Sequence, residues 1–274
     1  FHLINLGDFR ALRSLTSALL PANSDVPQVQ GMHAFALEQT GEHAAGEVLG
    51  REAAEAAFDP WAEHAVAHAL DSRGAHAEAI AWLSPRQARW RDLSSFLRTH
   101  NFWHLALAHL AAGDAGAALR LWDTEVWGVR PDHVQDQINA ISLLIRLERA
   151  GLGAEDRWQR LAPYLAANGP GGINAFADLH HAYGLARADA GPALEALLET
   201  LDADASRPNP PALAVATARA AKALVCHARG RFADAALGLA EALPALRQAG
   251  GSSMQQQLFA LLLAHAMDRS RQAA

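Results

Sequence analysis

Residues 102–123 read FWHLALAHLAAGDAGAALRLWD. Small and apolar residues recur at helical spacing in the first half, Gly113 follows them, and an alanine-rich run forms the second half. Glycine adopts the left-handed backbone conformation that ends a helix, and small side chains let two helices approach closely. The stretch therefore predicts an antiparallel helical hairpin.

The same hairpin pattern recurs along the whole chain. Its turn glycines are separated by 33 to 40 residues, and no strand-like alternation of useful length interrupts the pattern. We therefore predict an all-α fold in which residues 1–274 form a single repeat domain of about seven antiparallel hairpins, coiled into a right-handed superhelix. Because Phe1 lies inside a helical pattern, we also expect an N-terminal part to be missing. The turn glycines are Gly7, Gly41, Gly74, Gly113, Gly151, Gly191 and Gly230.

The composition excludes several classes of partner and compartment. The formal net charge is −6 and no Lys/Arg-rich run occurs, so the chain lacks the electrostatic signature of nucleic-acid or membrane-surface binding. No apolar run approaches the roughly 18–20 residues that span a bilayer. Cys226 is the only cysteine, which favours a reducing cytoplasm. Lys222 is the only lysine, and alanine is abundant; we interpret this bias as genome-wide and expect a bacterial protein.

Common catalytic motifs are absent from the sequence. There is no G-x-S-x-G elbow, and residue 65 is alanine where the zinc-protease motif H-E-x-x-H needs glutamate. The GPGG run at 169–172 lacks the lysine and the strand–loop–helix context of a phosphate-binding loop. Nucleotide chemistry and covalent serine or cysteine catalysis are therefore not expected.

Histidine pairs mark two neighbouring predicted helices. His64 and His68 lie in EHAVAHAL (63–70), and His100 and His104 lie in THNFWHLALAHL (99–110). Residues at i and i+4 share one helical face, so each pair can present two ring nitrogens to one ligand. These pairs are the most distinctive chemical feature of the sequence.

The period and these motifs carry a resemblance to tetratricopeptide repeats. Residues 31–47, 59–83 and 96–119 resemble the tetratricopeptide-repeat protein 38 family, with HAVAH and HN-aromatic-WH as its most specific pieces. ISLLIRLE and FADLHHAYGLA fit the family more loosely. The resemblance implies a helical-repeat protein with a histidine-bearing groove, and it carries no catalytic assignment.

The resemblance also implies which side chains face the groove. With the turn glycine counted as repeat position 15, positions 2, 5, 9 and 12 of each first helix line the concave surface. Polar and aromatic residues gather at or beside these positions in several units. The candidate ligand-binding residues are Glu38, His64, His68, Asp71, His100, Asn101, Trp103, Asp178 and His181.

Three interpretations of this cluster remain open. His64, His68, His100 and His104 could hold a divalent metal such as zinc, although position 6 directs His104 toward the neighbouring hairpin. Alternatively, the side chains hydrogen-bond one another between hairpins and serve only the fold. In the third interpretation, His–Asp pairs form a metal-free acid–base site, with His68, His100, Asp136, Asp178 and His181 as candidate catalytic residues.

These observations predict a binding module. We expect it to hold a small polar molecule or a short peptide in the histidine-rich groove. The alternative function is an enzyme, a metal-assisted or His/Asp-driven hydrolase or lyase, that uses the same residues.

Overall fold

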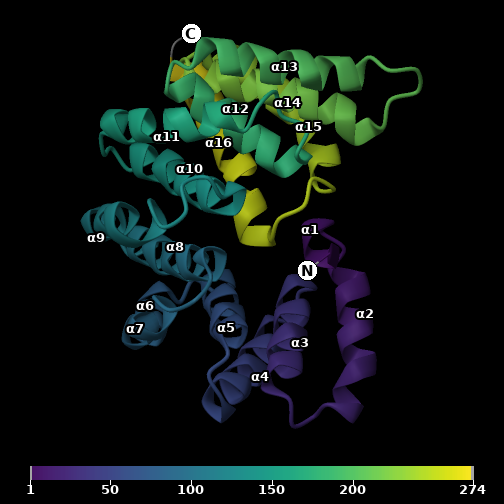
Figure 1. The fold of residues 1–274 in the computed structure, drawn as a ribbon, viewed down its shortest axis with the longest axis vertical. Helices are drawn as coiled ribbons and strands as arrows, with labels where there is room; N and C mark the ends of the chain where they lie inside the picture. The colour runs from purple at the N-terminus through teal and green to yellow at the C-terminus, as the bar shows by residue number, and fades with distance from the viewer. Residues whose placement is uncertain (1, 273–274) are drawn as a thin grey trace. The chain divides into compact units, whose positions relative to one another are not determined.

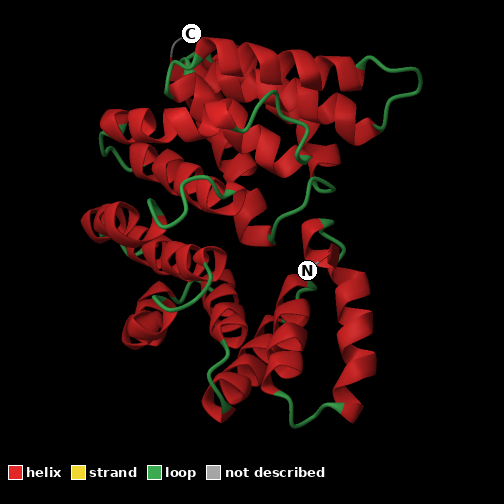
Figure 2. Cartoon of the chain, in the orientation of Figure 1, coloured by secondary structure: helices red, strands yellow, loops and turns green. Residues whose placement is uncertain are grey.

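The structure is a computed structural model that describes residues 2–272. Within this range the chain forms helices joined by short turns and loops, and no strand occurs (Figure 2). None of the described helices combines the length and apolar character that crossing a bilayer requires. The predicted all-α fold is therefore confirmed.

By packing, the chain divides into two compact units. The first unit contains the residues up to Arg130 together with Arg146–Leu152, and the second contains Pro131–Ile145 and the residues from Gly153 onward. Each unit is described by itself below. The expectation of a single repeat domain stays a prediction.

The first unit is built from short helices in hairpin order (Figure 1). A π-helical turn, Trp122–Val126, follows its last full helix. Helices α3, α4 and α5 pack on one another, as do α6, α8 and α9 in part. The helices are α1 His2–Asn5, α2 Phe9–Leu19, α3 Pro27–Gln39, α4 His43–Ala56, α5 Pro60–Ser72, α6 His76–Leu83, α7 Gln87–Trp90, α8 Ser95–Ala111 and α9 Ala115–Leu121.

The second unit consists of longer hairpins. Helix α10 begins in this unit, and its last turn belongs to the first unit. Helix α14 packs against α12, α13 and α15, and α15 packs against α16. In Figure 1, α13 and α14 run side by side in green. The helices are α10 Val134–Arg149, α11 Glu155–Ala167, α12 Ala175–Arg187, α13 Gly191–Ala205, α14 Ala212–Ala228, α15 Phe232–Leu246 and α16 Ser253–Gln272.

Left-handed glycines end the first helix of most hairpins, as the sequence predicts. Gly113 has φ +87°, its amide donates to the carbonyl of Leu110, and the amide of Asp114 donates to the carbonyl of His109. These two bonds satisfy carbonyls that the end of a helix leaves free. The same conformation occurs at Gly7, Gly41, Gly74, Gly151 and Gly230.

The sixth turn differs from its prediction. Asp189, with φ +52°, takes the left-handed conformation there, and the amide of Ala190 donates to the carbonyl of Leu185. Gly191, the predicted turn residue, is instead the first residue of α13. Aspartate tolerates this conformation better than most residues, so the glycine is not needed. The repeat register of α12 is therefore shifted by two residues from the predicted one.

Close helix approach in the first unit depends on glycines inside α4. A Cβ atom on Gly46 would lie 2.7 Å from the backbone oxygen of Ala34 in α3. A Cβ atom on Gly50 would lie 2.9 Å from the Val66 side chain in α5. Residues without side chains thus allow α3 and α5 to pack closely on α4, which places α3 beside the histidines of α5.

We predict that Gly46→Ala destabilises the protein by about 1–3 kcal/mol, because the added methyl group overlaps a backbone atom that cannot move freely. Gly116→Ala in α9 is the matched control: its nearest heavy atom outside the helix turn is 3.5 Å away on the Arg120 side chain. That substitution should stabilise by up to about 1 kcal/mol, since alanine favours helix. Urea unfolding of both variants measures the difference, and equal effects would contradict the packing argument.

Candidate functional site

Four histidine side chains converge between α5 and α8. His64 and His68 come from one face of α5, and His100 and His104 come from one face of α8. Counted from the turn glycines Gly74 and Gly113, they occupy positions 5 and 9 of one repeat and positions 2 and 6 of the next. The four side chains form the four-histidine cluster.

The ring nitrogens of the four-histidine cluster nearly touch. His64 Nε2 lies 3.1 Å from His100 Nε2 and 3.1 Å from His68 Nε2. His104 Nε2 lies 3.3 Å from His100 Nε2. One ligating atom from each of the four residues falls within 4.8 Å of all the others. The position of His104 toward the neighbouring hairpin thus brings it into the cluster.

Hydrogen bonds can link the four neutral imidazoles only if donor and acceptor tautomers alternate along the cluster. Each Nε2 carries either a proton or a lone pair, so it acts either as a donor or as an acceptor. The three contacts form a chain in which the nitrogens of His64 and His100 each face two others. A cation that accepts all four lone pairs would satisfy every nitrogen at once.

The rings are buried and favour the neutral form. His64, His68, His100 and His104 are 2%, 0%, 4% and 2% exposed. Burial first, and neighbouring imidazoles second, lower the pKa of His64, His68 and His104 well below the usual value. Neutral imidazole is the form that binds metal ions. The burial also means that these side chains do not line an open groove, which corrects the expected histidine-rich surface.

Aromatic side chains enclose the cluster. Trp103 stacks on His100 with ring centroids 5.4 Å apart and an interplanar angle of 9°. Phe35 packs against His64 and His68 from α3, with centroids 5.1 and 5.2 Å away. An apolar shell excludes water and holds the rings in place. Trp103 therefore packs against the cluster, in contrast to its predicted place in an open groove.

Glu38 lies at the edge of the cluster and approaches His68. Its carboxylate is 1% exposed, and one oxygen lies 3.7 Å from His68 Nδ1. Ser72 donates a hydrogen bond of 2.8 Å to the other oxygen, and burial raises the pKa of Glu38. A carboxylate behind a ligating histidine orients the ring and increases its basicity. Sequence reasoning found Glu38 but missed Ser72, although the two lie 34 residues apart, one repeat period.

Two other predicted residues of the first unit lie outside the four-histidine cluster. Asp71 is paired loosely with His76, at 3.8 Å between Oδ1 and Nδ1. Asn101 is 1% exposed, and neither its side-chain oxygen nor its nitrogen has a hydrogen-bond partner. The Nδ1 atoms of His64 and His104 are also buried without partners. Among the cluster's rings, the Nδ1 atoms of His64 and His104 are thus the ones left without partners.

The remaining candidates belong to the second unit. The Asp136 carboxylate lies 3.2 Å from His133 Nδ1. Asp178 accepts a hydrogen bond from the backbone amide of Ile173, and the described residues show no bond between Asp178 and His181. With Asp189 as the turn residue, Asp178 and His181 occupy positions 4 and 7 instead of the predicted 2 and 5. The expected His181–Asp178 acid–base pair is therefore not formed.

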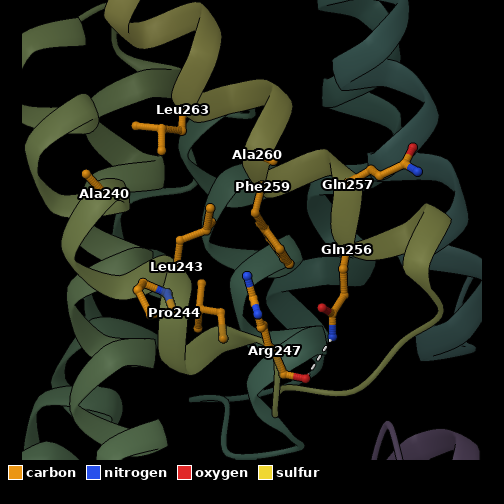
Figure 3. Close-up of a pocket in the computed structure, with 10 residues that line it drawn as sticks. Ala240, Leu243, Pro244, Arg247, Gln256, Gln257, Phe259, Ala260 and Leu263 are labelled. Atoms are coloured by element: carbon orange, nitrogen blue, oxygen red, sulfur yellow. Dashed lines mark hydrogen bonds between the residues drawn. The ribbon is translucent and has the colours of Figure 1, made fainter. Parts of the chain in front are cut away.

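A further groove in the second unit lies between α15 and α16 (Figure 3). It has a volume of about 440 Å³ and is lined mainly by apolar side chains, among them Leu243, Phe259 and Leu263. Gln256 closes one end through a hydrogen bond of 3.2 Å to the Arg247 carbonyl. No predicted site residue lines it.

Three of the nitrogen–nitrogen distances in the four-histidine cluster approach those of a tetrahedral metal site. Zinc–nitrogen bonds of about 2.0–2.1 Å place neighbouring ligands of a tetrahedron about 3.3 Å apart. The three contacts of 3.1–3.3 Å approach that value before any ion is considered. The residues can therefore hold a metal ion without a large rearrangement.

Comparison with known proteins places the fold in a class. No family model matches the chain. The chain is similar to a tetratricopeptide repeat protein from Parabacteroides merdae ATCC 43184, solved by crystallography at 2.39 Å resolution. The TM-score is 0.50 at 14% sequence identity, over 97% of this chain and 95% of that chain. The predicted fold, a tetratricopeptide-like helical solenoid, is confirmed.

We predict that the buried His181 makes the fold less stable as the pH falls. Burial lowers the pKa of His181 to about 4, below the roughly 6.5 of an unfolded histidine. The unfolded chain therefore binds more protons between these values, so stability is full above about pH 6.5 and falls as the pH drops toward 4. Between pH 7.5 and 4.5 the loss is about 2–3 kcal/mol.

Urea unfolding at several pH values, compared between the wild type and His181→Leu, measures this contribution. The variant should lose less stability on acidification by about that amount. Parallel pH profiles for the two proteins would show that His181 is not the group responsible.

Proposed function

We propose that the protein is a tetratricopeptide-like binding module whose first unit holds a divalent transition-metal ion, zinc foremost. The ligands are His64, His68, His100 and His104. The carrying observation is the convergence of their four buried Nε2 atoms, with three nitrogen–nitrogen contacts of 3.1–3.3 Å. Neutral imidazole suits zinc, copper, iron and nickel, and the near-tetrahedral spacing favours zinc.

Four protein ligands favour a structural site over a catalytic one. Catalytic zinc sites keep one coordination position open for water or substrate, whereas structural sites are closed by protein side chains. Here every ligand position of a tetrahedron is filled from α5 and α8. An enzyme that uses the same residues would need one imidazole to give way to water, so hydrolase or lyase activity is the less supported function.

The ion would tie one hairpin to the next. Helices α5 and α8 belong to consecutive repeats, and in repeat proteins the contact between neighbours sets the stability and the curvature of the array. A fixed α5–α8 junction would hold the shape of a surface that binds a peptide or a protein. On the HAVAH and HNFWH motifs we also propose kinship with the tetratricopeptide-repeat protein 38 family.

We predict that the full chain, stripped of metal and titrated at pH 7.5, takes up one Zn²⁺ or Co²⁺ per chain at the four-histidine cluster. Bound Co²⁺ should give the absorption spectrum of tetrahedral coordination. Metal at about 100 times its Kd should stabilise the fold by about 2.7 kcal/mol, because the ion binds the folded state. His68→Ala and His100→Ala should each weaken binding at least roughly tenfold, or about 1.4 kcal/mol.

His109→Ala is the matched control, because His109 lies on α8 with a side chain 21% exposed and outside the cluster. It should keep the metal content of the wild type. If the wild type binds no metal and the His68 and His100 variants melt at clearly lower temperature, the cluster serves packing alone and the proposal is wrong.

We predict that Glu38→Gln lowers metal affinity by about 10–100-fold, because the neutral amide no longer supports His68 electrostatically. Competition with a chelator of known affinity measures the change. Glu42→Gln, at the N-cap of α4 and with an exposed side chain, is the control. If Glu38 serves only the fold, the metal-free protein loses stability and the affinity stays the same.

A further inference from the structure

A separate pocket lies in the second unit, where α12 and α14 begin and α13 ends. Its volume is about 230 Å³, smaller than the usual pocket of a drug-sized ligand. The lining combines apolar side chains with carboxylate, amide and hydroxyl groups. The lining residues are Gly172, Asn174, Ala175, Asp178, Leu201, Asp204, Pro211, Leu213, Ala214 and Thr217. These residues form the Asp178 pocket.

A buried carboxylate, that of Asp178, lines the pocket, and no basic side chain lies in the lining. Asp178 is 2% exposed, and none of the ten lining residues is basic. Its only described hydrogen bonds come from the backbone amides of Ile173 and Gly172. Burial, opposed by these amides and reinforced by Asp204, raises the pKa of Asp178 to about 6. At neutral pH the free protein therefore holds a charge that its own side chains do not compensate.

The second carboxylate increases the negative potential of the pocket. Asp204 is also a lining residue, and its one described ion-pair partner is Arg207, 3.3 Å away and 60% exposed. The hydroxyl of Thr217 and the side-chain oxygen of Asn174 are occupied by backbone groups, at 2.7 and 2.9 Å. The pocket thus favours a positively charged ligand.

The apolar lining residues limit the kind of cation that the pocket could bind. Leu201, Leu213 and Ala214 would face a ligand without offering oxygen ligands, whereas a metal ion of the calcium type needs six to eight oxygens. An alkyl chain that ends in an ammonium group matches both kinds of lining group, since the stem packs on carbon and the head donates to carboxylate. The small volume suits one such group.

We propose that the Asp178 pocket binds a primary alkylammonium group, either of a free amine or of a lysine side chain in a peptide. Asp178 accepts from the ammonium head, Asp204 adds attraction, and the wall of Leu201 and Leu213 packs on the stem. This site lies in the second unit and does not depend on the metal proposed for the first.

Isothermal titration of the full chain with butylammonium chloride at pH 7.5 tests the proposal, with butanol as the uncharged probe and CaCl₂ as the metal probe. Saturable binding of butylammonium and no binding of butanol or Ca²⁺ is the expected result. A blocked Gly-Lys-Gly peptide and its acetyl-lysine form distinguish the source: tighter binding of the lysine peptide than of butylammonium identifies a peptide ligand, and the reverse identifies a free amine.

Three variants locate the site. Asp178→Asn should weaken butylammonium binding at least tenfold, and Ala214→Leu should abolish it by filling the pocket. Asp202→Asn is the control, because Asp202 lies on the same helix as Asp204 but pairs with Lys222 and does not line the pocket. Asp178→Asn should leave the melting temperature unchanged or higher, because an uncompensated charge is removed.

Two results would overturn the proposal: no saturable binding of butylammonium or the lysine peptide, or unchanged binding in both Asp178→Asn and Ala214→Leu. A lower melting temperature of Asp178→Asn with unchanged binding would show that Asp178 stabilises the 172–174 loop and does not bind the ammonium group. Metal uptake at the four-histidine cluster should be the same in all three variants, so failure here and failure of the metal site are distinguishable.

Discussion

The structure depends on one backbone constraint, the left-handed residue that ends the first helix of each hairpin. That residue sets the register of the repeat, and the register decides which side chains meet across neighbouring first helices. Where Gly74 and Gly113 take this conformation, positions 5 and 9 of one repeat meet positions 2 and 6 of the next. In the other direction, α3 presents Phe35 at position 9 to the same histidines. The four-histidine cluster follows from the register.

Desolvation is the main energetic cost of the four-histidine cluster. A core built for stability alone would place apolar side chains here, because buried imidazoles lose their hydration and must stay neutral. The four rings nonetheless remain close together, with three nitrogen–nitrogen contacts of 3.1–3.3 Å. A bound cation would offset this desolvation cost, because each ring would donate a lone pair to it. The energetic argument for a metal therefore comes from the burial of four converging imidazoles as well as from residue type.

The two units show the same principle, because each buries groups that could bind a cation. In the first unit neutral nitrogen lone pairs converge, and in the second unit a nearly buried carboxylate, Asp178, lines a small pocket without a basic neighbour in the lining. Burying such polar groups costs free energy unless they are paired. Groups retained at such a cost are commonly those that contact a ligand.

The sequence by itself determined the helices, their hairpin order and the two histidine pairs, because turn glycines and i, i+4 spacing act over a few residues. Only the tertiary structure decided that His104 joins the cluster, that the rings are buried, and that Ser72 supports Glu38, because these depend on faces of different helices meeting. The Asp189 turn shows the same limit. Aspartate and glycine can both be left-handed, so local sequence left the register of α12 open by two residues, and packing decided it.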